Sequence, residues 1–192
     1  MEPNMFCYQC QETAKGTGCI LKGVCGKESH TAQAMDLLLF VVRGVSVVAD
    51  VLRKADCPVS EEVNIFVTDA LFCTITNANF DDESILKRVD KGITMRNGLI
   101  QEAKHNKVLL PKVDELTWQG TRDDYAGKAK TVGVLREQNE DLRSLKELLV
   151  YGLKGMAAYL EHAMRLGFND DTVHVFMQRA LATIAVESLS AG

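Results

Sequence analysis

Hydrophobic residues beyond residue 28 recur mainly at the three- and four-residue spacing of an α-helix. Two long stripes predict helices over about residues 31–54 and 139–166. The first stripe contains Met35, Leu38, Leu39, Val42, Val45, Val48 and Leu52. The second contains Leu142, Leu145, Leu149, Leu153, Met156, Leu160 and Met164. Shorter patterns predict helices over about residues 60–77, 82–105, 122–130 and 170–187, so we expect an all-α fold.

Polar residues mark the expected helix ends. Thr31 suits the N-cap of the first helix and Ser60 that of the second. The acidic pairs Asp81-Asp82 and Asp170-Asp171 begin later helices, where capping is a better interpretation than acid–base chemistry. The segment 60–77 is rich in β-branched residues, so a strand is the alternative prediction there.

The chain contains an internal repeat. Residues 37–45 resemble residues 148–156, at an offset of 111 positions. With a one-residue gap, residues 66–71 fall on residues 176–181. The alternative is chance similarity between amphipathic helices. Because two helices and their turn recur in the same order, we expect two similar helical bundles of the three-helix type.

The repeat divides the chain into four parts. We expect a Cys-rich head over residues 1–28, a first three-helix bundle over 29–106, a connecting loop over 107–121 and a second bundle over 122–192. The third helix of the second bundle would begin near residue 191, so we expect that bundle to be incomplete.

An incomplete bundle leaves part of its apolar face without a partner. We expect such a partly open face to be built from Leu149, Leu153, Met156, Phe176 and Leu181. The cover would be the remainder of a longer natural chain, or a second copy through self-association.

Composition narrows the class of protein. The chain has 192 residues, 46% hydrophobic and 25% charged, with a net charge of −4. This balance is typical of a globular protein, and no Lys/Arg cluster indicates a nucleic-acid partner. The longest apolar run, residues 37–42, is too short to span a bilayer, and the N-terminus lacks the pattern of a secretory signal. We therefore expect no membrane partner and a cytoplasmic location.

Four of the six cysteines lie in the head. Cys7, Cys10, Cys19 and Cys25 follow the spacing Cys-x2-Cys-x8-Cys-x5-Cys among several glycines. A cluster of this density in a chain without a signal peptide indicates a metal or redox site. Iron–sulfur, zinc and unligated thiols all remain open from spacing alone. Three lysines of the head would offset the charge of a thiolate-bound cluster: Lys15, Lys22 and Lys27.

Other residues that suit chemistry favour structural interpretations. Cys73 lies on an apolar helix face, and Cys57 precedes a proline in a turn. Trp118 in the connecting loop is expected to pack rather than to stack on a ligand. The histidines have no metal-ligand spacing and are expected to be structural or solvated: His30, His105, His162 and His174.

Several strings resemble the hybrid cluster proteins, also called prismane proteins or hydroxylamine reductases. They are Met5-Phe6-Cys7-Tyr8-Gln9-Cys10-Gln11-Glu12-Thr13, Gly18-Cys19, Gly23-Val24-Cys25-Gly26-Lys27, Thr74-Ile75-Thr76-Asn77-Ala78-Asn79, Asn139-Glu140-Asp141-Leu142-Arg143-Ser144-Leu145 and Gly152-Leu153-Lys154-Gly155. The resemblance implies that Cys7, Cys10, Cys19 and Cys25 bind a [4Fe–4S] cluster. A subgroup of the family with wider cysteine gaps is associated with [2Fe–2S] instead.

Members of this family are much longer than 192 residues. The resemblance implies that this chain corresponds to the N-terminal electron-transfer domain and lacks the later α/β domains. Those domains hold a hybrid Fe–S–O cluster that reduces hydroxylamine to ammonia. Nitric oxide is the alternative substrate. The implied partners are the remaining domains and an electron-donor protein, and this chain alone is expected to be inactive. The alternatives are a stand-alone redox or sensor module and a zinc-stabilised structural domain.

Overall fold

The two longest apolar stripes form the two longest helices, α1 (Ser29–Lys54) and α6 (Glu140–Arg165), of 26 residues each. The computed structural model describes residues 5–10 and 12–186. The other main helices of that part are α2 (Glu61–Cys73), α3 (Asp82–His105), α5 (Tyr125–Val132) and α7 (Asp171–Val186). Shorter turns are η1 (Ala14–Gly16), α4 (Asp114–Thr117), η2 (Arg122–Asp124) and η3 (Val134–Arg136). The described residues contain no strand, so the all-α prediction is confirmed.

Helix ends follow the capping residues in most places. Asp81 accepts a hydrogen bond from the backbone N–H of Ser84 at 3.1 Å. Asp170 accepts one from the backbone N–H of Thr172 at 2.8 Å, so capping is confirmed for both acidic pairs. Thr31 is not the first N-cap, because α1 begins after Glu28 and buries Thr31 in its first turn.

Two expected segments differ in detail from the structure. The segment expected over residues 60–77 is a helix, but α2 ends at Cys73, where the Thr74 hydroxyl donates to the carbonyl of Leu71. Asn77 has a φ of 60°, which a continuing α-helix does not allow. The loop over residues 107–121 contains the one-turn helix α4. The expected end of the last helix near Glu187 and the start of another near residue 191 lie outside the described residues.

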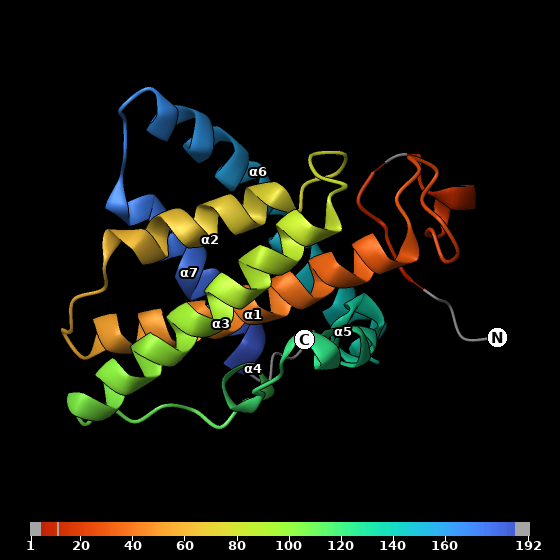
Figure 1. Ribbon diagram of the computed structural model, residues 1–192. Helices are drawn as coiled ribbons and strands as arrows, with labels where there is room; N and C mark the ends of the chain where they lie inside the picture. The colour runs from red at the N-terminus through yellow and green to blue at the C-terminus, as the bar shows by residue number, and fades with distance from the viewer. Residues whose placement is uncertain (1–4, 11, 187–192) are drawn as a thin grey trace.

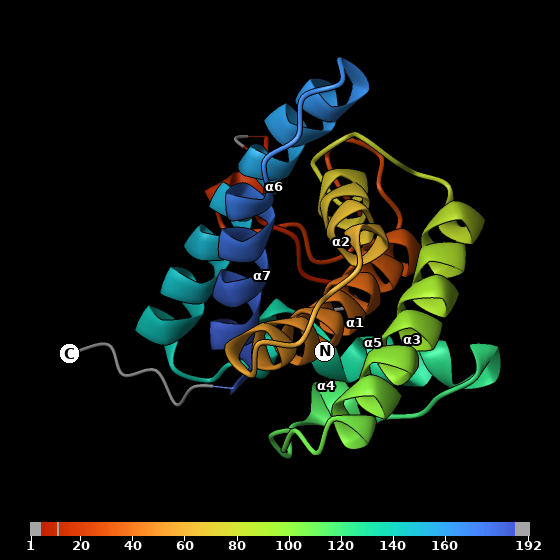
Figure 2. The ribbon, with the colours of Figure 1, turned by 90° about the vertical axis from the view of Figure 1, so that its left-hand side faces the viewer.

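The internal repeat reappears in the helix boundaries. Residues 29–54 of α1 lie 111 positions before residues 140–165 of α6, and α2 begins 110 positions before α7. The two helical hairpins pack reciprocally, since α1 contacts α7 (Figure 2) and α2 lies mainly against α6. Helix α3 and the short helix α5 pack along other sides of α1.

Reciprocal packing joins the hairpins in one core. A single cluster of buried side chains includes residues of α1, α2, α3, α5, α6 and α7. Leu153 and Leu181 are therefore buried, contrary to the expectation of an open face, whereas Phe176 is 53% exposed and Leu149 and Met156 are half-buried. The division into units over 29–106 and 122–192 stays a prediction.

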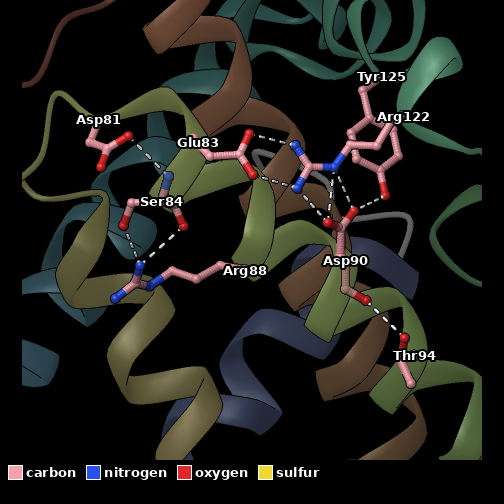
Figure 3. Close-up of polar contacts among 8 residues, drawn as sticks. All are labelled: Asp81, Glu83, Ser84, Arg88, Asp90, Thr94, Arg122 and Tyr125. Carbon is pink, nitrogen blue, oxygen red and sulfur yellow. Dashed lines mark hydrogen bonds and ion pairs between the residues drawn. The ribbon is translucent and has the colours of Figure 1, made fainter.

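Two arginines fix the chain between α3 and α5. The Arg96 guanidinium is fully buried and donates to the carbonyls of Glu115 and Trp118 at 2.9 and 2.8 Å. Arg122 pairs with Glu83 and Asp90 of α3 at 3.1 and 2.5 Å, and the Tyr125 hydroxyl donates to Asp90 at 2.7 Å (Figure 3). None of the helices in the described residues has the length and hydropathy needed to cross a membrane.

Candidate metal centre

The cysteine head lies beside the N-terminal end of α1 (Figure 1). Cys7 and Cys19 face each other in an antiparallel backbone pair, in which the Cys7 N–H donates to the Cys19 carbonyl at 3.1 Å and the Cys19 N–H donates back at 2.9 Å. Cys19, Met5 and Ala32 form a small buried cluster against which Cys7 packs. Two of the four predicted ligands are thus brought side by side.

Close contacts disfavour a side chain at two glycines of the head. Gly18 has a φ of 125°, and a Cβ atom there would lie 2.7 Å from the Phe6 ring. A Cβ atom on Gly23 would lie 3.0 Å from the sulfur of Cys25 and 3.2 Å from the backbone nitrogen of Lys27. The positive φ makes Gly18 strained for any other residue, and a side chain at Gly23 would crowd the Cys25 sulfur and the Lys27 backbone.

The thiols lie in different surroundings. Burial opposes ionisation of Cys19, but backbone N–H groups of Ala14 and Val24 and the Thr13 hydroxyl lower its pKa below the ordinary value. The Ala14 nitrogen lies 3.5 Å from the Cys19 sulfur. Burial raises the pKa of Cys7, although Lys27 acts in the opposite direction. Hydrogen bonds to a sulfur stabilise the thiolate, which is the form that binds metals.

The other two predicted ligands are more open, because Cys10 is half-buried and Cys25 is exposed. Within residues 5–10 and 12–186, no group of three or more histidine, cysteine, aspartate or glutamate side chains is placed to hold one metal ion. The four-cysteine ligand set stays a prediction. The donors themselves fit an iron–sulfur or zinc site, since four thiols lie on one short folded segment and one already accepts a backbone N–H.

A cleft of about 810 Å³ separates the head from α6. Cys7 and Cys10 line it from the head, Asp36 from α1, and Glu147 and Lys154 from α6.

Residues far along the chain support this region. The Thr76 hydroxyl donates to the Gln9 carbonyl at 2.8 Å, and the Lys154 ammonium donates to the Thr74 carbonyl at 3.1 Å. Both segments belong to strings that carry the family resemblance. Sequence reasoning assigned them no role, although a lysine inside an apolar helix stripe was a usable signal.

The remaining candidates have structural roles. Cys73 is 5% exposed and accepts from Asn79 at 3.2 Å, and Cys57 is half-buried in the turn before Pro58. Trp118 packs edge-on against Phe40 with ring centroids 5.9 Å apart. Each histidine has a structural contact or is exposed: His30 pairs with Asp82, His162 lies edge-on to Phe72, His174 bonds to Thr68 and Asn169, and His105 is exposed.

Residues 5–191 match the Prismane/CO dehydrogenase family, and the chain belongs to it. Three similar relatives carry the name hydroxylamine reductase. The one from Bacteroides thetaiotaomicron is 54% identical over 94% of this chain and 32% of its own length. Those from Porphyromonas gingivalis and Desulfitobacterium hafniense are 48% and 46% identical, over 100% and 98% of this chain and 35% of their own lengths. The chain thus spans about a third of the curated relatives it matches.

Proposed function

We propose that this chain is the N-terminal electron-transfer part of a hydroxylamine reductase, and that Cys7, Cys10, Cys19 and Cys25 hold a [4Fe–4S] cluster. The observation that carries the proposal is the four-cysteine head, folded against α1 in a chain that aligns over 94% of its length with a relative named hydroxylamine reductase. The Prismane/CO dehydrogenase match over residues 5–191 supports iron–sulfur chemistry for this head.

The residues of this chain would bind and tune the group rather than act on a substrate. A [4Fe–4S] cluster, when bound, supplies one-electron transfer. The antiparallel pair of Cys7 and Cys19 sets the spacing of two sulfurs, and the Ala14 N–H stabilises the Cys19 thiolate. Four cysteine ligands leave no iron position open, so hydroxylamine has no place to bind in this head.

The chemical step belongs, in this proposal, to the part of the protein beyond this chain. There a hybrid Fe–S–O cluster would reduce hydroxylamine to ammonia and water with two electrons and two protons, or reduce nitric oxide. The partners are those domains and an electron-donor protein in the cytoplasm. This chain alone is expected to show no steady hydroxylamine turnover above that of free iron.

Metal and sulfide analysis of anaerobically purified and reconstituted chain tests the proposal. We expect about four irons and about four acid-labile sulfides per chain. Zinc without sulfide would replace the proposal by a zinc-stabilised structural domain. A chain that binds neither metal would overturn both.

Replacement of Cys10 by serine tests the ligand set. Cys10→Ser should lower bound iron and bleach the visible absorption, because serine does not supply a thiolate. Cys57→Ser is the matched control, since Cys57 lies in the turn after α1 and not in the head. Unchanged iron content in Cys10→Ser removes Cys10 from the ligands.

A further inference from the structure

Two lysines are buried beside the cysteine head. Lys27 and Lys154 are each only 2% exposed, and both line the cleft that Cys7 and Cys10 also line. Lys27 comes from the end of the head, whereas Lys154 comes from α6, far along the chain. Lysine is rarely buried to this degree unless an anion accompanies it, because the ammonium loses its hydration.

The contacts of the two ammonium groups leave several of their N–H donors without a hydrogen-bond acceptor. Lys154 Nζ donates to the Thr74 carbonyl at 3.1 Å. Lys27 Nζ lies 3.3 Å from the sulfur of Met35 and 6.0 Å from the centre of the Phe80 ring, both of which are weak partners. Among the described residues no carboxylate oxygen lies within 4.0 Å of either nitrogen. An ammonium has three N–H donors, so each lysine has donors left for an anion in the cleft.

The carboxyl groups of the cleft compensate this charge only in part. Asp36, Glu140 and Glu147 line it, and burial raises the pKa of Glu147 and raises that of Asp36 to about 7. Burial lowers the pKa of Lys154 to about 8, which leaves it mainly charged at neutral pH. Lys27 is buried in the same cleft that Cys7 lines. The cleft therefore keeps positive charge next to the cysteines.

The repeat provides an internal comparison for Lys154. Its equivalent in the first hairpin is Arg43 of α1, which is also buried. Arg43 has a carboxylate partner, because its Nε lies 3.7 Å from Glu115. Lys154 has no such partner among the described residues and faces the cleft of the head instead. The second repeat thus retains a buried cation where the cysteine head lies, without the acidic partner of the first.

We infer that Lys154, together with Lys27, supplies the positive charge that balances a thiolate-bound iron–sulfur cluster in the head and raises its reduction potential. The inference rests on the proposed function. A cluster bound by four thiolates is an anion, and reduction makes it more negative. A buried cation nearby stabilises the reduced form more than the oxidised form. Lys154 would therefore act on the cluster through its charge, without binding iron itself.

The test is a redox titration of the reconstituted chain, followed by its spectrum, together with iron analysis. The variants are Lys154→Met, which keeps an unbranched side chain of similar length without the charge, and Lys154→Arg, which keeps the charge. In Lys154→Met we expect the ratio of reduced to oxidised cluster at a fixed potential to fall about tenfold, or about 59 mV for a one-electron couple. Lys154→Arg should retain the wild-type potential within a small part of that shift.

Lys104→Met is the matched control, because Lys104 is an exposed lysine in the last turn of α3. Its potential should equal that of the wild-type chain. Loss of iron from Lys154→Met but not from Lys154→Arg, with helical content retained in both, also supports the inference. An unchanged potential in Lys154→Met, or equal loss of iron from both variants, would overturn it by making the role of Lys154 one of packing.

Lys27→Met repeats the test from the other side of the cleft. If Lys154→Met does not fold, the same fall in the reduced fraction is expected of Lys27→Met, and an unchanged ratio there overturns the inference. A wild-type chain that acquires no iron–sulfur cluster is a different result, because it overturns the proposed function and this inference with it. A wild-type cluster with unaltered potentials in the lysine variants overturns the inference alone.

Discussion

Gly44 and Gly155 occupy equivalent positions of the repeat but have opposite surroundings. A Cβ atom on Gly44 of α1 would lie 2.5 Å from the carbonyl oxygen of Glu115, whose backbone crosses the helix there. A Cβ atom on Gly155 of α6 would meet nothing within 4 Å. The same residue type is therefore required by a close approach in one repeat and only lowers helix stability in the other.

Alanine substitution of these two glycines should change stability in opposite directions. Gly44→Ala should lower the free energy of unfolding by about 1–3 kcal/mol, because the gain in helix propensity is smaller than the cost of displacing the backbone at Glu115. Gly155→Ala should raise it by about 0.5–1 kcal/mol. Urea unfolding followed by circular dichroism measures both. A stabilised Gly44→Ala variant would contradict the close approach.

At the scale of elements, the hydrophobic period was enough to find most helices. The bounds of α3 and α6 follow their stripes and caps, since amphipathic faces dominate such long helices. The period did not predict where α2 ends, because Thr74 and the positive φ of Asn77 depend on local hydrogen bonding and on the turn beyond. Thr31 suits a cap by residue type, but α1 begins one turn earlier, after Glu28, and Thr31 is buried within it.

The candidate site could be predicted from the sequence only in part. The spacing of the four cysteines is local, so the sequence alone indicates them. The position of Lys154 beside them is not local, because it depends on how α6 packs against α2 and on the Thr74 carbonyl at the end of α2. A single sequence shows a basic residue within an apolar stripe but not which distant segment it meets.

The contact between α3 and the segment of η2 and α5 depends on Asp90. Burial opposes its ionisation, but hydrogen bonds from Arg122 and Tyr125 lower the pKa of Asp90 below its ordinary value (Figure 3). A carboxylate whose pKa is lower when folded stabilises the fold above the unfolded pKa of about 3.9 and loses that contribution as pH falls through the folded pKa. The contact should therefore be complete at neutral pH and lost in acid.

Removal of Arg122 tests this contact. Arg122→Ala should lower the free energy of unfolding by about 1 kcal/mol at pH 7, near the upper end for partly exposed pairs, because one guanidinium joins two carboxylates. The difference from wild type should shrink as pH falls below about 4, as Asp90 becomes protonated. Arg165→Ala is the control, since the Arg165 side chain is 69% exposed and pairs with Glu161 of its own helix. An Arg122→Ala deficit that does not change with pH would remove Asp90 from the contact.

At the scale of the whole molecule, reciprocal packing of the two hairpins places repeat-equivalent polar residues against each other. Asn64 and His174 occupy one pair of equivalent positions, and Thr68 and Gln178 another. Thr68 bonds to His174 at 3.1 Å, and Gln178 donates to Asn64 at 2.8 Å. Each hairpin therefore supplies hydrogen-bond partners for buried polar residues of the other. This mutual pairing fits a single core that includes both repeats.

Several apolar side chains of α6 are not covered by this exchange, and two of them, Leu148 and Tyr151, border the cleft beside the cysteine head. Leu145, Leu148, Tyr151 and Tyr159 are 54%, 67%, 57% and 82% exposed and follow one another at helical spacing. A contiguous apolar surface of this kind is unusual on a soluble monomer. In a chain that spans about a third of its relatives, we expect the isolated molecule to cover this face with a second copy of itself.

One pair of variants distinguishes specific self-association through α6 from non-specific aggregation. Sedimentation velocity across the micromolar range should show a concentration-dependent dimer for the wild-type chain, because burial of even one large apolar side chain contributes about 1.5–3 kcal/mol. Leu145→Glu should shift the chain to monomer, since a dimer would have to bury the new carboxylate, and Leu145 does not line the cleft beside the head. Leu109→Glu should leave the dimer intact, because Leu109 is 91% exposed in the connecting segment, away from α6. A wild-type chain that stays monomeric at every concentration would contradict this prediction and show that this face remains exposed to solvent.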